Sequence, residues 1–482
     1  MKTLLKIIGI ITGVLILAAV TAYVAWFHNS EEHTLQLNPS EVFAEERGDD
    51  YLITNANIID VENDVVLENR HLLIQNGRFE LIFEGSIPDS LSQNVTIVDA
   101  ESRYLMPSMF DMHAHLNSGG LIPPDDTTRL MALEQFARYG VGAIFTLGGM
   151  GFNQDVTAGL IQQQKDKEMV APRIFAAGDI LTSPGGYPIP FLAQMLGKPA
   201  EELDLNEQGM IEITNSTELE PIISKKQELE LNGVKVMVES RLGGATPESR
   251  ISNETVERIA ETASEYNLPV FAHVTNRADL EAAVDINVDV IAHNVSADSL
   301  TNATPHITKM IEDSIYITPT LLMSFRVEFL QSAEMLDDPF YLQYSSERTN
   351  RSMENWPIRQ MIASNMGGNA VAKKQLVLYN FSRLHEAGVP VMMGTDAGNP
   401  TMFPGYSAHK ELEFMADAGM SAAEILQSAT IIPARFLNVD ETMGSIAVGK
   451  VASLIMLDEN PLDDVSHTQT LSRVMLEGYW LD

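Results

Sequence analysis

Two histidines separated by a single alanine stand at the end of an apolar run, in the segment LMPSMFDMHAH. Because alternate side chains of a β-strand point to the same face, His113 and His115 would project side by side into one space. Imidazole nitrogen is a good ligand for borderline divalent metals such as zinc. Such a pair also arises by chance on a solvated strand edge. The apolar strand and the Gly119-Gly120 loop after it favour a metal site at an open mouth.

The histidine pair belongs to a series of apolar segments that alternate with amphipathic ones. In NETVERIAETASEY, for example, Val256, Ile259, Ala260 and Ala263 fall on one helical face. Eight such units predict an α/β fold, a (β/α)8 TIM barrel rather than a doubly wound sheet. The predicted strands are MPSMFDMHAH, VGAIFTLGG, PRIFAAGDIL, VKVMVES, PVFAHV, DVIAHNV, IYITPTLL and VPVMMGTDA.

Four more residues with metal-binding or catalytic chemistry lie on these strands. Lys235 lies on the fourth strand, and His273 ends the fifth. His293 ends the sixth strand and Asp396 ends the eighth. Active sites of this architecture lie at the C-terminal ends of the strands, so we expect these side chains to share one rim with the histidine pair. A long insertion at residues 330–375 should lie over the barrel mouth.

Both ends of the chain carry short alternating strands outside the barrel units. YLITNANIID and VVLENRHLLIQNGRFELIFEG precede the barrel, whereas GSIAVGKVASLIMLD and LSRVMLEGYWL follow it. Their spacing and turn residues predict a small β-sandwich built from both termini. The predicted organisation is a membrane anchor or signal segment (1–28), a linker (29–48), the first part of the β-sandwich (49–106), the barrel (107–436) and the second part of the β-sandwich (437–482).

An uncharged apolar stretch from Ile7 to Phe27 follows Lys2 and Lys6. As a helix it is long enough to cross the ~30 Å hydrocarbon layer, and the positive-inside rule places the rest of the chain outside the cytoplasm. We therefore predict an uncleaved transmembrane anchor with an extracytoplasmic, periplasmic catalytic domain. The alternative is secretion after cleavage of a signal peptide at small residues such as those of 20–22.

Composition narrows the possible partners and ligands. The net charge of −35 over 482 residues makes nucleic acid and anionic lipid surfaces unsuitable partners. The chain has no cysteine, so it forms no disulfides and any metal must bind to histidine, carboxylate or modified lysine. The oligomeric state is left open, a homo-oligomer included.

Several motifs in combination resemble the metal-dependent amidohydrolase superfamily, in the branch related to imidazolonepropionase and Xaa-Pro dipeptidases. They are DMHAH, VFAH, IAHN, HEAGVPVMMGTDAG and GSIAVGKVASLIMLDENPL. The similarity covers nearly everything from about Tyr51 to the C-terminus. The chain departs from the family at Ser108, usually glycine, and at Ser453, often aspartate. Tyr187 follows two glycines in TSPGGYP where relatives often carry histidine, on a loop that faces the substrate.

The resemblance implies a centre of two divalent metal ions, with zinc as the default and manganese or cobalt as alternatives. His113, His115 and Asp396 would bind the first ion. His273 and His293 would bind the second, and Lys235 would bridge the two as a carbamate formed with CO2. An unmodified lysine there would be a costly buried cation beside two others, and carbamate formation removes this conflict. Glu239, on the same strand face, is the alternative bridge.

The implied reaction is hydrolysis of an amide C–N bond, in a dipeptide or a non-peptide substrate, by attack of a metal-bridging hydroxide. Two such ions can lower the pKa of a shared water to about 7. Asp396 would take the proton of this water and pass it to the leaving nitrogen. A carboxylate of the substrate could be held by Tyr187 or by Arg241, although Arg241 could equally pair with surface acids.

Two other functions remain open at this stage. The first is a mononuclear deaminase or lactonase of the same fold, in which Lys235 is unmodified and His293 is catalytic. The second is a non-catalytic, membrane-tethered binding protein. Such proteins usually lack metal ligands, and in this chain all six positions are filled.

Overall fold

The computed structural model describes residues 50–481, except 123, 150, 168, 170, 242–248, 333, 355–358 and 361–369. The predicted membrane anchor and the predicted linker therefore lie outside the described residues. Across the part of the chain that is described, no helix is both long and apolar enough to span a membrane.

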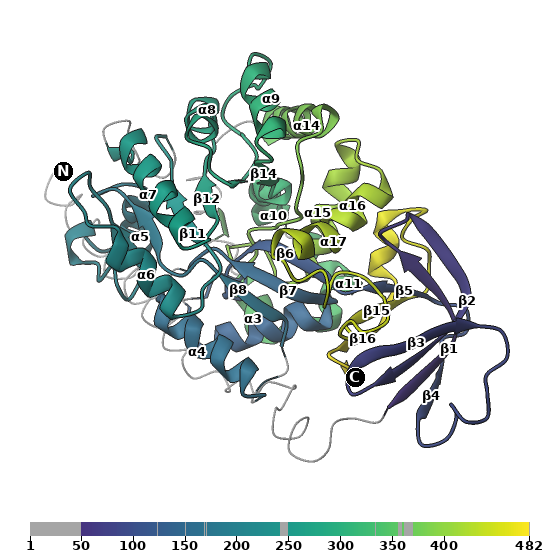
Figure 1. Ribbon diagram of the computed structural model, residues 1–482. Coiled ribbons are helices and arrows are strands. Elements are labelled where there is room, and N and C mark those ends of the chain that lie inside the picture. The colour runs from purple at the N-terminus through teal and green to yellow at the C-terminus, as the bar shows by residue number, and fades with distance from the viewer. Residues whose placement is uncertain are drawn as a thin grey trace, which may run out of the picture.

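The two ends of the chain meet in one mixed sheet, as the sequence predicted. Figure 1 shows the purple N-terminal strands beside the yellow C-terminal strands. The strand order is β17-β16-β15-β5-β1-β2-β3, with β4 paired to β1. The strands are β1 (Tyr51–Asp60), β2 (Val65–Gln75), β3 (Arg78–Glu84), β4 (Thr96–Asp99), β5 (Tyr104–Pro107), β15 (Leu454–Leu457), β16 (Leu471–Leu476) and β17 (Tyr479–Leu481).

Hydrogen bonding joins the eight strands of the predicted β-sandwich into one continuous sheet, whose β3 end also pairs with residues 449–451 next to β15. The sheet is continuous because β5 pairs antiparallel with β15, where Leu105 lies opposite Met456 and links the two chain ends directly. The strand β15 contributes to two hydrophobic cores. Leu454 and Met456 pack in a core formed by this sheet, and Ile455 and Leu457 pack in the large core of the central region. Alternation along one strand therefore ties the sheet to the central region.

The central region contains parallel strands that alternate with helices. One sheet has the order β6-β7-β8 and the other has the order β10-β9-β11-β12-β13-β14. The strands are β6 (Met109–Ala114), β7 (Val141–Thr146), β8 (Arg173–Ala176), β9 (Ile180–Thr182), β10 (Met210–Glu212), β11 (Val234–Met237), β12 (Val270–His273), β13 (Val290–Ala292) and β14 (Tyr316–Thr318).

Two of the eight predicted strands differ from expectation. The third is split into β8 and β9 at Gly178, which has a φ of +69°. The eighth forms only isolated parallel bridges, from Val391 to Ile317 and from Ala397 to Ala114. It thus lies between β14 and β6 without forming a regular strand, because Asp396 adopts a positive φ there.

The helices have the predicted amphipathic character. In α7, Ser252 caps the N-terminus by accepting from Thr255 N, and Val256, Ile259 and Ala263 are buried. The helices of the repeating units are α3 (Asp126–Arg138), α4 (Gln154–Lys165), α5 (Ile189–Leu196), α6 (Glu220–Glu228), α7 (Asn253–Glu265), α8 (Arg277–Ile286), α9 (Thr304–Glu312), α14 (Ala370–Ala387), α15 (Tyr406–Asp417), α16 (Ala422–Ser428) and α17 (Ile431–Phe436). The segment after β14 forms η3 (Leu321–Phe325), α10 (Arg326–Ser332), η4 (Glu334–Asp337), α11 (Pro339–Tyr344) and α12 (Glu347–Met353), and two further 3-10 turns are η1 (Ala200–Glu202) and η5 (Val465–Gln469).

We expect Ile455→Ala to destabilise the protein by about 2–5 kcal/mol, because it leaves a cavity where the sheet packs on the central core. Chemical denaturation measures this loss, with Val448→Ala as a control at an exposed position (61% exposed). The sheet and the central region share this core, so unfolding of Ile455→Ala should remain a single transition. Two separate transitions, or a loss below about 1 kcal/mol, would contradict this packing.

Candidate metal centre

The six predicted metal-binding residues line one cavity of about 140 Å³. Their imidazole rings form a continuous row. The ring centroids of His115 and His113 lie 5.8 Å apart, those of His113 and His293 4.4 Å, and those of His293 and His273 4.5 Å. Four histidines at the C-terminal ends of β6, β12 and β13 therefore lie together at one place.

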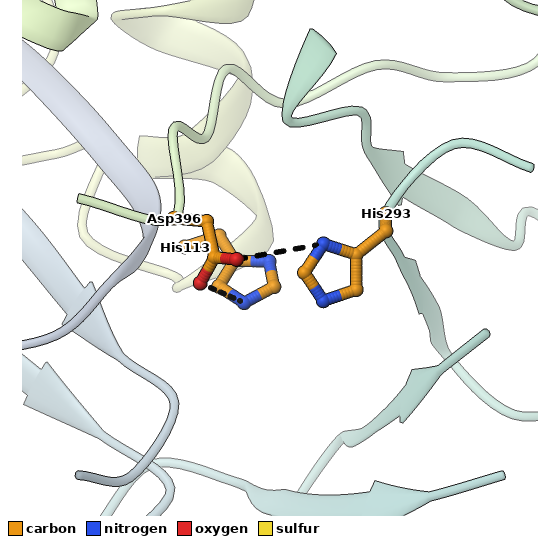
Figure 2. Close-up of side chains that lie close together, drawn as sticks. All are labelled: His113, His293 and Asp396. Carbon is orange, nitrogen blue, oxygen red and sulfur yellow. Dashed lines mark ion pairs between the residues drawn. The ribbon is translucent and has the colours of Figure 1, made fainter. Parts of the chain in front are cut away.

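Asp396 reaches three of these rings. Its Oδ1 lies 2.8 Å from Nε2 of His115 and 3.4 Å from Nε2 of His113, and its Oδ2 lies 3.9 Å from Nδ1 of His293. Figure 2 shows His293 facing His113 and Asp396 from the opposite side of the site. The ligand atoms of these last three residues all lie within 4.8 Å of one another, as in a metal-binding site.

The backbone at two of these residues is in the left-handed region. Asp396 has a φ of +61° and His293 a φ of +83°. Each such conformation costs about 1–3 kcal/mol for a non-glycine residue, and persists when the surroundings fix it. The amide of Asp396 donates to His113 O at 2.6 Å, and that of His293 donates to Thr318 O at 2.9 Å. Strained residues fixed in this way are characteristic of functional sites.

Asp111 connects the two segments that carry the first set of ligands. Its Oδ1 accepts from the amides of His113 and Thr395, and its Oδ2 accepts from the Thr395 hydroxyl at 2.5 Å. The segments approach so closely that a Cβ on Gly394 would lie 2.8 Å from the Cβ of His113. Asp111 therefore fixes the position of Asp396 relative to the histidine pair.

Hydrogen bonds also orient individual rings. Nδ1 of His115 contacts the Gly148 carbonyl, which leaves its Nε2 directed at Asp396. Nδ1 of His293 lies 2.8 Å from the Thr320 hydroxyl. Outer contacts of this kind commonly fix the tautomer of metal-binding histidines.

The electrostatics favour neutral imidazoles. Burial, together with Lys235 and the neighbouring rings, lowers the pKa of His113 well below its usual value. Burial and the proximity of His273 and Lys235 have the same effect on the pKa of His293. Neutral imidazole is the form that binds a metal ion.

Lys235 and Glu239, the two alternatives for a bridging ligand, have different surroundings. Nζ of Lys235 is buried and has no hydrogen-bond partner among the described residues, and burial lowers its pKa to about 7 against the opposing effect of Asp396. Glu239 accepts from the Thr275 hydroxyl at 2.5 Å and from the Arg241 amide at 2.6 Å. Burial would raise the pKa of Glu239, but these bonds and His273 lower it to about 2.

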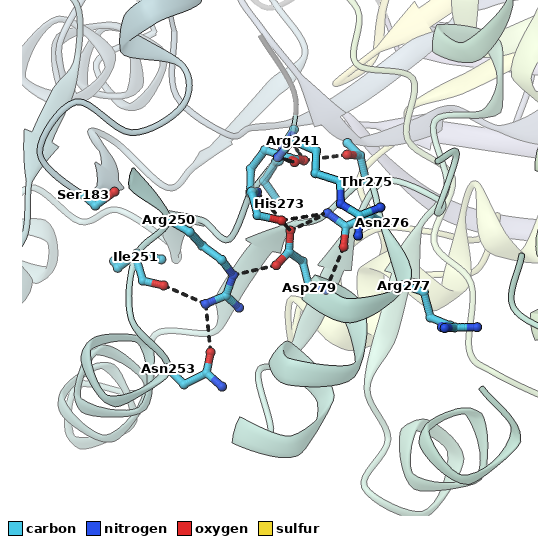
Figure 3. A network of polar contacts seen from close by, with 12 residues as sticks. Ser183, Arg241, Arg250, Ile251, Asn253, His273, Thr275, Asn276, Arg277 and Asp279 are labelled. Atoms are coloured by element: carbon cyan, nitrogen blue, oxygen red, sulfur yellow. Dashed lines mark hydrogen bonds and ion pairs between the residues drawn. The ribbon is translucent and has the colours of Figure 1, made fainter. Parts of the chain in front are cut away.

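Glu239 bonds to Arg241 and Thr275, which belong to a polar network at the ends of β11 and β12; Figure 3 labels these two partners. Its Oε2 lies 3.5 Å from Nε2 of His273. One turn away, Asp279 accepts from the amide and hydroxyl of Ser240 and from Nε of Arg250 at 2.5 Å. The network holds the two strand ends together and positions His273.

The two predicted substrate-binding residues lie in different environments. Tyr187 lines the cavity, and its ring stacks on His273 with centroids 5.1 Å apart. Arg241 is absent from the cavity lining. Its side chain is 57% exposed and pairs with Asp298 at 3.2 Å, which agrees with the other prediction for Arg241, an ion pair with a surface acid.

The sequence did not identify two cations of the cavity wall, Arg326 and Lys373. Both follow β14: Arg326 lies just before the predicted insertion at 330–375, and Lys373 lies within it. No motif marks them, because an arginine in an amphipathic stretch such as SFRVEFL resembles any surface residue. The expectation that this insertion covers the mouth was the one available signal.

Comparison with known proteins gives a family match and a shared fold. Residues 104–481 match the amidohydrolase family model. No curated protein matches the sequence. A Xaa-Pro dipeptidase with bound methionine is 23% identical, with a TM-score of 0.69 over 90% of this chain and 100% of that one. A putative prolidase from Bifidobacterium longum is 23% identical (TM-score 0.66, 90% and 94% covered), and a molinate hydrolase is 19% identical (TM-score 0.70, 91% and 96% covered).

We expect Asp111→Asn to weaken metal binding by about 10–100-fold, because an amide nitrogen would oppose one of the donors that Asp111 now accepts. Competition with a chelating indicator dye measures the dissociation constant. Asp298→Asn is the control, since it removes a carboxylate that pairs with Arg241 outside the cavity. A folded Asp111→Asn protein with wild-type metal affinity would show that Asp111 does not position the ligands.

Proposed function

Since the chain belongs to the amidohydrolase family and is a hydrolase acting on carbon–nitrogen bonds, we propose that it uses two divalent metal ions to cleave the amide bond of a small substrate such as a dipeptide. The observation that carries this proposal is the convergence of four histidines, Lys235 and Asp396 on one cavity. The family membership agrees with the resemblance found in the sequence motifs.

The residues present fit a pair of ions. His113, His115 and Asp396 would hold the first ion, and His273 and His293 the second. A buried atom supports this assignment, because Nζ of Lys235 has no hydrogen-bond partner among the described residues. Buried polar atoms are rarely left unpaired unless a ligand or ion completes them. Zinc is the default ion for this set of ligands, with manganese and cobalt as alternatives.

Lys235 is proposed as the bridge, in the form of a carbamate. A pKa of about 7 leaves a large share of this amine neutral near neutral pH, and only a neutral amine attacks CO2. The neutral amine adds to CO2 and releases one proton, which leaves a carbamate anion with two ligand oxygens. Glu239 fits this role less well, because its carboxylate already accepts two hydrogen bonds.

The chain's own residues would orient the substrate and move the proton. When bound, the ions would lower the pKa of a water molecule toward about 7 and polarise the scissile carbonyl. Asp396 lies at the centre of the ligands and would take the proton of the attacking water. The same carboxyl group would then donate this proton to the leaving nitrogen.

The proposal also covers the overall architecture of the central region. We propose that the parallel strands and residues 391–397 close into one (β/α)8 barrel. Support comes from the bridges of residues 391–397 to both β14 and β6, and from the Asn232 amide, which donates to Ala176 O at 2.7 Å.

On the sequence of residues 7–27 alone, we propose an extracytoplasmic domain held by an N-terminal membrane anchor.

A mononuclear deaminase or lactonase is the second candidate. The close group of His113, His293 and Asp396 is the observation that favours it, because these three residues alone fit one ion. Metal analysis separates the two candidates, since the first requires two ions per chain and the second only one.

We expect Lys235→Ala to lose the dinuclear centre. Its activity should fall more than ~100-fold, which is the upper end of the loss seen when a residue that only supports a metal ligand is removed. Metal analysis and a screen of Xaa-Pro, Xaa-Arg and N-acyl amino acid libraries measure both effects. Glu239→Ala is the matched comparison and should keep two ions. Two ions and full activity in Lys235→Ala, with loss of both in Glu239→Ala, would reverse the assignment. A screen in which only lactones react would overturn amide hydrolysis.

Metal reloading tests the carbamate directly. After a chelator has removed the ions and CO2 has been depleted, metal plus bicarbonate should restore activity faster than metal alone. At constant dissolved CO2, the rate should rise with pH through about 7, because the neutral fraction of Lys235 increases. Reactivation that is indifferent to bicarbonate would rule out a carbamate.

A further inference from the structure

The wall of the cavity contains an arginine that forms no ion pair with any acidic residue that the structure describes. Arg326, the first residue of α10, lines the cavity together with the histidines and Asp396. Its one hydrogen bond within the described part of the chain is from Nη1 to the sulfur of Met323, at 3.4 Å. Thioether sulfur is a weak acceptor, so most donors of this guanidinium remain available.

The position of Arg326 is set by a buried carboxylate on another element. Glu411, in α15, accepts from the amides of Leu321 and Leu322 at 2.7 and 2.8 Å, one bond to each oxygen. These two residues begin the turn η3, which leads directly into Arg326. The same turn carries Thr320, whose hydroxyl contacts His293. Glu411 therefore positions the turn that precedes Arg326 and that contacts His293.

A second cation and a hydroxyl face the same space. Lys373, in the first turn of α14, lines the cavity and is exposed to solvent. Tyr187 interacts with charges of both signs. Burial raises the pKa of its hydroxyl, the positive charge of Arg326 opposes this rise, and the negative charges of Asp396 and Glu239 add to it. No described residue accepts a hydrogen bond from this hydroxyl.

We propose that Arg326, assisted by Lys373 and Tyr187, forms a subsite for a carboxylate of the substrate, so that this hydrolase acts on amides with a free carboxylate near the scissile bond. This inference rests on the proposed function and narrows its substrate class to acylated amino acids and dipeptides. Arg326 supplies a planar pair of donors that matches a carboxylate. Apolar residues such as Ile180, Phe191 and Met237 line the rest of the cavity and would contact a side chain of the substrate.

The other role open to Arg326 is balancing the charge of Asp396. No ion pair joins these two side chains in the described part of the chain, so the guanidinium is available to a ligand even without metal. Once divalent ions occupy the ligands, they neutralise Asp396, and two protein cations remain beside two metal cations. A negatively charged substrate group removes this repulsion, whereas an uncharged substrate leaves it in place.

Pairs of substrates that differ only at the carboxylate test this subsite. For an N-acetyl amino acid and its primary amide, the acyl bond to be cleaved is the same. We expect kcat/KM of the wild-type protein to be about 10–100-fold higher for the carboxylate, the range for a charged hydrogen bond. Arg326→Met should lower this ratio about tenfold or more through loss of kcat/KM for the carboxylate, with an unchanged metal content. Lys373→Met should lower the ratio by a smaller factor.

Arg277→Met is the matched control, because Arg277 points away from the polar network in Figure 3, is 39% exposed and lies outside the cavity lining. It should keep the wild-type ratio. The subsite is wrong if Arg326→Met lowers both rates equally, if it leaves the ratio unchanged, or if the wild-type protein prefers the amide.

Binding without turnover separates this inference from the proposed function. On protein stripped of metal, N-acetyl-L-leucine should raise the melting temperature, N-acetyl-L-leucinamide should not, and Arg326→Met should abolish the difference. If metal-loaded protein hydrolyses neither compound but this protection is seen, the subsite stands and amide hydrolysis fails. If hydrolysis occurs but protection is equal for the two compounds, the function stands and the subsite fails.

Discussion

The structure depends on the close approach of two segments that are almost 300 residues apart in the chain. His113 lies on β6 and His115 follows directly after it, whereas Asp396 lies in residues 394–398. Asp111 bonds to both segments, and the amide of Asp396 donates to the carbonyl of His113 at 2.6 Å. Asp396 has a positive φ at this contact, and the eighth predicted strand forms only isolated bridges. The irregular backbone places a carboxylate beside three imidazoles.

A second constraint follows from what this approach buries. Four histidines, Lys235 and Arg326 line one cavity, and Asp396 is the acid of its lining. Burial lowers the pKa values of Lys235 and of His113, His273 and His293, so the protein holds these groups closer to their neutral forms. Neutral imidazoles and a neutral amine are poor charge partners but good reactants, the first toward metal ions and the second toward CO2. The electrostatics therefore agree with a metal centre and a carbamate.

Much of this site could be predicted from the sequence, because its residues occupy strand ends with a recognisable spacing. The HxH pair and the strand-end positions of His273, His293 and Asp396 were enough to predict that these side chains lie at one site. What the sequence missed depends on tertiary contacts. Arg326 is placed by Glu411 from a helix some 85 residues later, and no local pattern records that contact. The single sheet at the chain ends arises from the pairing of β5 with β15, which alternation alone cannot specify.

The most direct measurement is anomalous X-ray diffraction at the zinc absorption edge from crystals of the zinc-loaded protein. A dinuclear centre predicts two peaks about 3.5–4 Å apart. One peak should be bound by His113, His115 and Asp396 and the other by His273 and His293, with density for a carbamate on Lys235 between them. A single peak, or peaks remote from these side chains, would contradict the account.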